Sequence, residues 1–167
     1  MIQNDLAIYE LTDEGDLAII HQLAIQIWEP TYRNIISKQQ IDFMFEKMYS
    51  MPSLQHQFNE LGHHFLVASK QNKPVGFATY FFESAQKVRI PKLYILSDYQ
   101  KTGIGTGLLN KIESIGMEQA IKHIELNVNR FNKALKFYEK AGFKIIETVD
   151  IPYHNFVLND YVLMKTI

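Results

Sequence analysis

A glycine-bearing loop between an apolar run and an amphipathic stretch is the part of this sequence best suited to chemistry. The loop spans residues 100–105 (QKTGIG), follows the apolar residues 93–96 and precedes the amphipathic residues 104–121. This order predicts a buried strand, a loop and a helix start, which aim backbone N–H groups and the positive end of a helix dipole at an anion. Because Gly103 and Gly105 have no Cβ, the backbone can turn sharply and approach a ligand closely. The pattern predicts a phosphate-bearing ligand.

The spacing of residues after Gly103 excludes two other kinds of nucleotide-binding loop. A dinucleotide fingerprint that starts at Gly103 needs glycine or alanine at position 108, and a P-loop that starts there needs Gly-Lys from that position onward. Position 108 is Leu108, so neither motif is present. A Gly-x-Gly pair alone also fits a helix start held by close packing, so other residues must decide.

Two segments together resemble the GCN5-related N-acetyltransferase (GNAT) superfamily. The loop from Gln100 to Gly105 is similar to the family's Q/R-x-x-G-x-G/A loop, which also follows a strand. Downstream, Asn127 on a predicted strand is followed by residues 132–143 (NKALKFYEKAGF), which resemble the family's second signature. The resemblance is sharp between about residues 92 and 143, and in element order it covers roughly the whole chain.

The resemblance implies a fold and a co-substrate. The fold is α/β (α+β), a single GNAT domain over residues 1–167, with a mixed central sheet of about seven strands, about four flanking helices and splayed strands at the coenzyme A site. The co-substrate is acetyl-CoA, whose pyrophosphate is bound by backbone N–H groups of the loop. The coenzyme-binding residues implied are Ile95, Leu96, Gln100, Lys101, Thr102, Gly103, Ile104, Gly105, Thr106, Asn127, Asn132, Tyr138 and Lys140. Asn132 also suffices as a helix cap, and Lys140 also fits an ordinary exposed helix lysine.

Two catalytic roles follow from the same resemblance. Tyr138 is the candidate general acid, because a phenol is normally protonated at neutral pH and can donate to the coenzyme A thiolate as it leaves. A tyrosine on an amphipathic helix is, however, often a core residue with a wet hydroxyl. The N–H of Leu96 is expected to stabilise the oxyanion that forms when an amine attacks the thioester.

The acceptor side is less well defined by the residues. Trp28, Tyr32, Tyr80, Glu83 and His154 are expected to line the acceptor pocket, together with Phe82 and Tyr153. An ammonium acceptor must lose a proton, so a carboxylate or a water chain should lie there. Glu83 and Glu29 are the candidate bases, although each also fits a solvated surface carboxylate.

The acceptor class is suggested by residues 27–32 (IWEPTY), the capped helix after them and the tail 154–166. These segments look like the bacterial polyamine (spermine/spermidine) acetyltransferase branch of the family. A polycationic acceptor favours a rim of carboxylates, to which Glu29, Asp42, Glu46, Glu83, Asp150 and Asp160 could contribute. The alternatives are a protein or peptide N-terminus or another amino compound as acceptor, a different acyl donor, and a non-catalytic module that binds acyl-CoA as a sensor.

Composition agrees with a compact cytoplasmic enzyme. The 167 residues are 47% hydrophobic and 21% charged, with a formal net charge of -1 and no cysteine. Disulfides, thiolate metal sites and an acetyl-cysteine intermediate are therefore excluded. The charge gives no footprint for nucleic acid, and no apolar run approaches the roughly 20 residues that span a bilayer. His63 and His64 point to opposite faces of a strand, so no metal site is expected. A homodimer is possible, but no sequence feature specifies its interface.

The other segments predict strands and helices without a linker, a repeat or a low-complexity tract. Thr12 is expected to cap a first helix that breaks near Glu29, because Pro30 disfavours helical backbone before it. Ser37 begins a capping box for a second helix that ends before Pro52. After a short helical turn to residue 62, the expected elements are a hairpin at 63–69 and 75–82, a strand at 88–96, the loop and helix at 100–122, a strand at 124–128, a helix at 133–141, and strands near 143–149 and 156–164, all after a first strand near 6–11.

Overall fold

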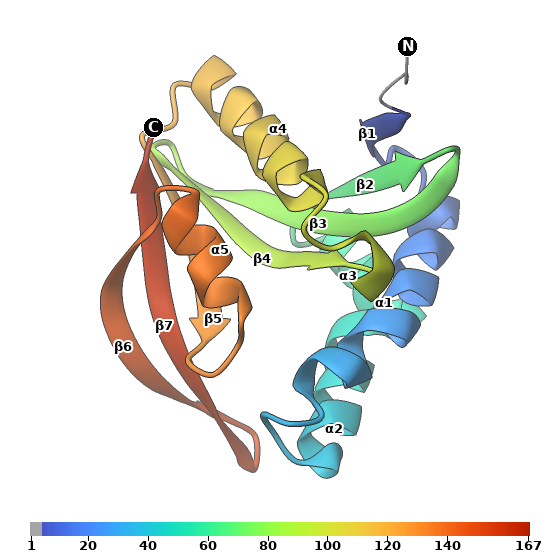
Figure 1. Ribbon diagram of the computed structural model, residues 1–167, viewed down its shortest axis with the longest axis vertical. Coiled ribbons are helices and arrows are strands. Elements are labelled where there is room, and N and C mark those ends of the chain that lie inside the picture. Colours follow the sequence, from blue (N-terminus) through green and yellow to red (C-terminus); the bar gives the residue numbers. More distant parts are fainter. Residues whose placement is uncertain (1–4) are drawn as a thin grey trace.

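The chain folds around one seven-stranded mixed sheet with helices on both faces (Figure 1). The computed structural model describes residues 5–167. In chain order the elements are β1 (Leu6–Glu10), α1 (Leu17–Tyr32), α2 (Lys38–Tyr49), α3 (Met51–Asn59), β2 (His64–Lys70), β3 (Lys73–Ser84), β4 (Lys87–Ile95), α4 (Ile104–Glu118), β5 (His123–Asn129), α5 (Ala134–Lys140), β6 (Lys144–Tyr153) and β7 (Phe156–Thr166). The predicted fold class is confirmed. A third helix, which begins at the cap Ser50 with Pro52 in its first turn, stands where only a short helical turn was expected.

The strand order is β1-β2-β3-β4-β5-β7-β6, and every neighbouring pair is antiparallel except β4 and β5. Helices α1, α2 and α3 pack on one face, where they meet Phe65, Val67 and Phe77 of β2 and β3. Helices α4 and α5 cover the other face over a core that includes Leu108 and Leu126. The sheet thus has one apolar layer on each side, which its alternating side chains require.

The splay of β4 from β5 is the feature of the sheet that matters for function. The two strands pair only over residues 87–89 of β4 and 123–125 of β5. Beyond Arg89, β4 stays paired with β3 as far as Ile95, across one register shift, but has no strand partner on its β5 side within residues 5–167. The predicted splayed strands are therefore present, and part of the β4 backbone is left unpaired by the sheet.

Helix α1 continues through Pro30 to Tyr32, so the expected break near Glu29 is wrong. Pro30 lies in the last turn and is exposed, so its missing N–H and its ring disturb the solvent side only. The Arg33 N–H donates to the Glu29 carbonyl at 2.9 Å and closes the last turn. The continuous helix keeps Tyr32 on its buried face.

The start of the first helical region also differs from the expectation. The Asp13 side chain, and not that of Thr12, accepts the N–H of Gly15 at 2.7 Å. This cap opens a short 3-10 turn, Glu14–Asp16, that leads into α1. The Ser37 cap of α2 is confirmed, since its hydroxyl accepts the Gln40 N–H at 3.1 Å.

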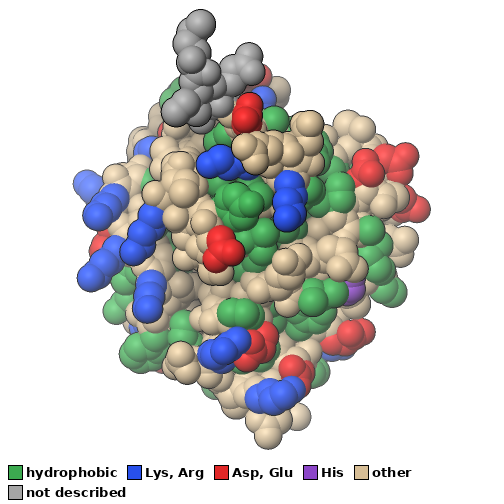
Figure 2. Space-filling model, turned by 45° about the vertical axis from the view of Figure 1, so that its right-hand side comes forward, with side chains coloured by type: hydrophobic (Ala, Val, Ile, Leu, Met, Phe, Trp, Pro, Cys, Tyr) green, Lys and Arg blue, Asp and Glu red, His purple; other side chains and the backbone are tan. Residues whose placement is uncertain are grey.

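Charge is mixed on the face drawn in Figure 2, where basic side chains gather toward one side and acidic ones toward the other. Within residues 5–167, no helix is long and apolar enough to cross a membrane.

Candidate functional site

The N-terminus of α4 is open to a ligand. Gly103 is its N-cap residue, and no side chain of the described chain caps the first turn. The Gly103 carbonyl accepts the Gly107 N–H at 2.9 Å, so the helix begins directly after the loop. The first N–H groups of any helix have no partner within it, and here they carry no side-chain cap that a ligand would have to displace. This geometry fits an anion.

The two loop glycines have different structural roles. Gly103 has a φ of +87°, and a Cβ built on it would meet no atom within 4 Å. The residue therefore permits a left-handed turn beside open space. A Cβ on Gly105 would lie 2.9 Å from Phe137 Cζ and 3.2 Å from Ile95 Cδ1. Gly105 thus lets α4 approach α5 and β4 closely, which is the packing alternative that the sequence left open.

The other loop residues are placed around these two glycines. Lys101 is exposed and has a φ of 60°, and Thr102 Oγ1 donates to the Tyr99 carbonyl at 2.5 Å. Gln100 Nε2 donates to the Ile95 carbonyl at 3.1 Å, so this side chain ties the loop to the end of β4. Ile104 is buried and Thr106 is exposed in the first turn of α4.

The Leu96 N–H donates to the Val75 carbonyl at 2.9 Å, which corrects its expected role as oxyanion donor. That amide points into β3 and is already paired. Backbone groups alternate along an antiparallel ladder, so those of Leu93 and Ile95 face the β5 side, where β4 has no strand partner. The sequence identifies the strand. It does not show which of its residues direct their backbone groups toward β5, because that depends on how β3 and β4 pair.

Tyr138 lies in α5 with only 7% of its surface exposed. Burial raises its pKa well above the usual value, and the nearby Tyr32 adds to the increase. The phenol is therefore protonated across the neutral range, as a proton donor must be. Its ring packs against Phe137 and Phe143, with centroids 5.2 and 5.8 Å away.

Tyr32 connects the helical side of the site to β4. Its hydroxyl lies 2.8 Å from that of Tyr94. Its pKa is raised, first by burial and also by the Asp160 carboxylate, while hydrogen bonds with Tyr94 and Asn132 lower it. Residues from α1, β4, β7 and the turn before α5 therefore meet at one phenol. That Tyr32 lines the acceptor pocket stays a prediction.

Trp28 lies behind Tyr32 and is 3% exposed. The two rings are 4.4 Å apart, and the Trp28 indole donates to the Ile41 carbonyl at 3.0 Å. Trp28 therefore packs behind Tyr32 in the core. The expectation that Trp28 lines the acceptor pocket is wrong.

Asn127 and Asn132 both have structural partners. Asn132 Oδ1 accepts the Ala134 N–H at 3.0 Å, as expected for the start of α5. Asn127 Oδ1 accepts from Arg89 at 2.6 Å, and its Nδ2 donates to Asp160 at 3.4 Å. Asn127 thus joins Asp160 to the charged residues where β4 and β5 still pair.

Tyr80 and Glu83 do not take the places expected for them. The Tyr80 hydroxyl donates to Glu10 at 3.1 Å, its ring stacks on His64, and it belongs to the core beneath α4. Glu83 is bound by Lys87 at 2.9 Å and lies 3.8 Å from Arg89. Side chains alternate along β3, and the bulges of this strand shift that alternation. Tyr80 therefore lies on the face of the sheet that α4 covers, and not in the expected acceptor pocket.

The remaining expected residues lie at the periphery. His154 occupies the turn between β6 and β7, with its ring 4.8 Å from that of Phe43 on α2. Tyr153 also packs on Phe43. Lys140 is exposed near the end of α5. Glu29 is exposed and paired with Arg33 at 2.6 Å, so neither candidate base is a free carboxylate.

The family follows from a comparison with known families. Residues 32–152 match the model of the acetyltransferase (GNAT) domain, which covers the loop, the splayed strands and Tyr138. The chain belongs to the GNAT acetyltransferase family.

Among its relatives, this GNAT domain is 30% identical to a spermidine N(1)-acetyltransferase of Thermoplasma acidophilum over 145 residues, which are 80% of this chain and 85% of that protein. It is 32% identical over 101 residues to an uncharacterized N-acetyltransferase of Mycobacterium tuberculosis, a match that covers 60% of this chain and 65% of the relative. The solved structure of the PaiA N-acetyltransferase from Thermoplasma acidophilum, in complex with coenzyme A, superposes with a TM-score of 0.82 at 26% identity and covers 97% of this chain and 99% of that one.

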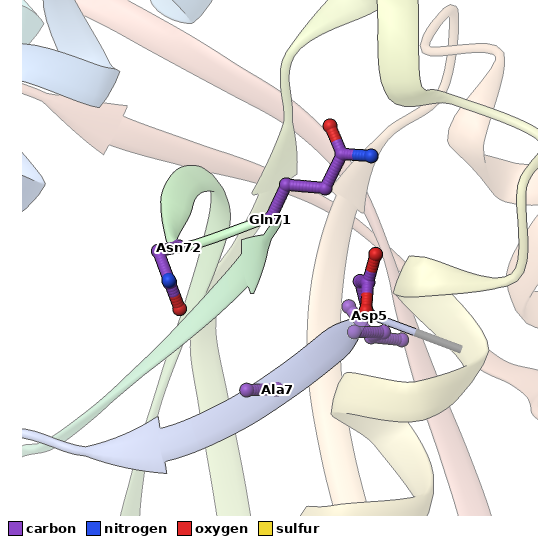
Figure 3. Close-up of a pocket in the computed structure, with 5 residues that line it drawn as sticks. Asp5, Ala7, Gln71 and Asn72 are labelled. Carbon is purple, nitrogen blue, oxygen red and sulfur yellow. The ribbon is translucent and has the colours of Figure 1, made fainter. Parts of the chain in front are cut away.

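Figure 3 shows a hollow of about 440 Å³ on this GNAT domain, at β1 and the turn between β2 and β3. It is lined by Asp5, Leu6, Ala7, Gln71 and Asn72, none of which belongs to the site. The labelled side chains of Gln71 and Asn72 point in different directions. Among residues 5–167, no group of three or more His, Asp or Glu side chains is placed to hold a metal ion.

Proposed function

We propose that this protein is an acetyl-CoA-dependent N-acetyltransferase that acts directly on a primary amine of a small molecule, with a polyamine as the first candidate acceptor. The observation that carries the proposal is the open N-terminus of α4 beside the unpaired edge of β4. Family membership and the spermidine N(1)-acetyltransferase relative support the activity and the acceptor class.

The residues at this place fit coenzyme A. The first N–H groups of α4 hold the pyrophosphate, and Gly103 leaves room for it. The backbone groups of Leu93 and Ile95 hold the pantetheine chain in place of the missing β5 pairing. The coenzyme, when bound, supplies an acetyl thioester that is open to attack by an amine.

The chain's own groups then serve the transfer. An N–H on the β5 side of β4, from Leu93 or Ile95, takes the oxyanion role that Leu96 cannot fill. Tyr138 gives its proton to the departing sulfur. With no cysteine in the chain, the acetyl group passes to the amine without an acetyl-cysteine intermediate.

Two measurements test the proposal. Saturating acetyl-CoA is expected to raise the melting temperature, because a ligand that binds only the folded state stabilises it. A panel of spermidine, spermine, simple diamines, amino acids and a peptide with a free N-terminus is then assayed for release of coenzyme A. A thiol reagent suits this assay, because a chain with no cysteine gives no background.

The outcomes separate the parts of the proposal. Turnover with polyamines and not with the peptide supports it in full. Turnover with the peptide alone overturns the acceptor class, and a melting shift without turnover of any amine indicates a binding module. The absence of a shift overturns the donor.

A further inference from the structure

Asp160 is a partly buried carboxylate to which no cation within residues 5–167 is bound, whereas Glu46, which also lacks an ion pair in that range, is exposed. Among the ion pairs of residues 5–167, Glu83 and Glu125 are held by Lys87 and Arg89, Glu29 by Arg33, Asp42 by Lys38, and Asp150 by Arg130. Asp160 is in none of these pairs. Its one side-chain hydrogen bond within that range is a 3.4 Å contact with the Asn127 amide.

The position of Asp160 is also specific. It lies on β7, in register with Asn129 of β5 and Val149 of β6, and is partly buried. Its charge acts on the phenol of Tyr32, which in turn acts on Tyr138. Tyr32 is therefore near enough to both the Asp160 carboxylate and the candidate acid for charge to act between them.

We propose that Asp160 binds the acceptor ammonium and takes its first proton, so that Asp160 acts as the base and Tyr138 as the acid. This inference rests on the proposed acetyl transfer. Asp160 thereby replaces Glu83 and Glu29 as the candidate base, because those two carboxylates already form ion pairs. Burying a carboxylate charge without a neighbouring cation costs free energy. A bound ammonium substrate would supply that cation and offset the cost.

The ammonium gives one proton to an Asp160 oxygen, and the freed nitrogen lone pair forms the C–N bond to the acetyl carbon. The C–S bond breaks with its electron pair on sulfur, which receives the Tyr138 proton. The amide nitrogen loses its second proton, which restores the Tyr138 hydroxyl, and Asp160 releases its own proton to water. The products are the acetamide, coenzyme A thiol and one proton.

Burial raises the pKa of Asp160, while its contact with Asn127 and the charge of Arg130 lower it. The charge of Asp160 acts in turn on the Tyr32 phenol of α1, and Asn129 of β5 lies opposite Asp160 in the register of β5 with β7. A carboxylate with a raised pKa is a better proton acceptor than an exposed one.

The decisive experiment compares the pH dependence of kcat/KM for Asp160→Asn with that of the wild type. With Asp160 present, the ammonium is the productive form, so kcat/KM stays nearly flat from about pH 6.5 to 8.5. In Asp160→Asn only free amine reacts. Because the amine pKa is about 10, kcat/KM then rises about tenfold per pH unit over the same range. At pH 7 the variant is expected to be about 10²–10³-fold slower.

A merely structural role of Asp160 would lower the rate without adding this slope. Glu147→Gln is the matched control, because Glu147 is an exposed carboxylate on β6 in register with Val162, two residues from Asp160. It is expected to keep the wild-type profile. The acetyl-CoA melting shift reports whether each variant folds and binds the donor. If Asp160→Asn does not fold, Asp160→Glu decides, since it retains a carboxylate and is expected to keep the flat profile at a reduced rate.

Each result has a consequence. An Asp160→Asn profile as flat as that of the wild type, or a sloped profile for Asp160→Glu, overturns the inference and leaves the acetyltransferase function intact. A wild type that binds acetyl-CoA but acetylates no amine overturns the proposed function, and the inference with it.

Discussion

The phenol oxygens of Tyr32 and Tyr94 lie 2.8 Å apart. Tyr32 is the last residue of α1, and Tyr94 is next to the last residue of β4. Their hydrogen bond therefore holds the end of a helix against the splayed end of a strand. It also holds Tyr32 where the charge of Asp160 acts on its phenol, and where Tyr32 acts in turn on Tyr138.

Tyr32→Phe is expected to lower the free energy of unfolding by about 1–3 kcal/mol, because the partly buried Tyr94 hydroxyl loses its partner. It should also raise KM for the amine while leaving the affinity for acetyl-CoA unchanged. Urea unfolding and steady-state kinetics measure the two effects. Tyr9→Phe serves as the control, since Tyr9 is 41% exposed on β1 and should change neither quantity. An unchanged KM in Tyr32→Phe would remove this phenol from the acceptor site.

Tyr138→Phe is expected to reduce kcat about 10²-fold or more, since general acid catalysis contributes about 10²–10⁴-fold. The ring and its packing against Phe137 and Phe143 remain, so the acetyl-CoA melting shift should persist. Single-turnover kinetics of coenzyme A release measure the chemical step directly.

Tyr161→Phe is the control for this loss, because Tyr161 packs partly buried against the same core on β7. It should keep the wild-type rate. Equal rates for Tyr138→Phe and the wild type would make Tyr138 a core residue, the alternative that its burial also allows.

Local signals account for the parts of the fold that the sequence predicts well. The Gln100 to Gly105 loop and the caps of α2 and α5 each depend on residues close in sequence, and the structure has them where expected. Gly142, with a φ of 96°, ends α5 as a glycine after the helix C-terminus should. These features can be predicted from the sequence because they require no partner that is distant along the chain.

The misplaced residues depend on strand pairing instead. The paired amide of Leu96 and the face taken by Tyr80 follow from the register of β3 with β4, which includes bulges that the sequence does not signal. Tyr94 belongs to the apolar run 93–96, and alternation along a strand there predicts that Tyr94 and Leu96 share one face. Asp160 is one of six expected rim carboxylates. Four of the others are held in ion pairs and Glu46 is exposed, and these facts, which need the fold, single out Asp160.

The loop glycines offer a test that separates strain from ligand binding. Gly103→Ala is expected to destabilise the chain by about 1–2 kcal/mol, because alanine is strained at a φ of +87°. It should also weaken acetyl-CoA binding, since the methyl group enters the open space assigned to the pyrophosphate. Isothermal titration measures the affinity.

Gly62→Ala is a matched control for that strain. Gly62 has a φ of +68° with no atom within 4 Å of a built Cβ, and it lies after α3, away from the loop. It should lose similar stability and keep the wild-type affinity. Equal affinities for both variants would show that the phosphates do not lie at Gly103.

Lys92 makes stability depend on pH. It is 6% exposed, and burial lowers its pKa from 10.5 to about 8. Its amine donates to Gln57 Oε1 at 2.5 Å and lies 5.5 Å from the ring centre of Tyr49. Below about pH 8 the folded and unfolded chains both carry the proton, so the cost of burying the charge is constant.

Between about pH 8 and 10.5 the unfolded chain keeps a proton on Lys92 that the folded chain has lost. Stability should therefore rise with pH over this window, by up to about 3 kcal/mol from this group. Lys92→Met is expected to abolish the rise, because it leaves nothing to titrate there. Lys111→Met, at an exposed position of α4, should retain it. Urea unfolding at closely spaced pH values measures both slopes, and a rise that persists in Lys92→Met would mean that another group causes it.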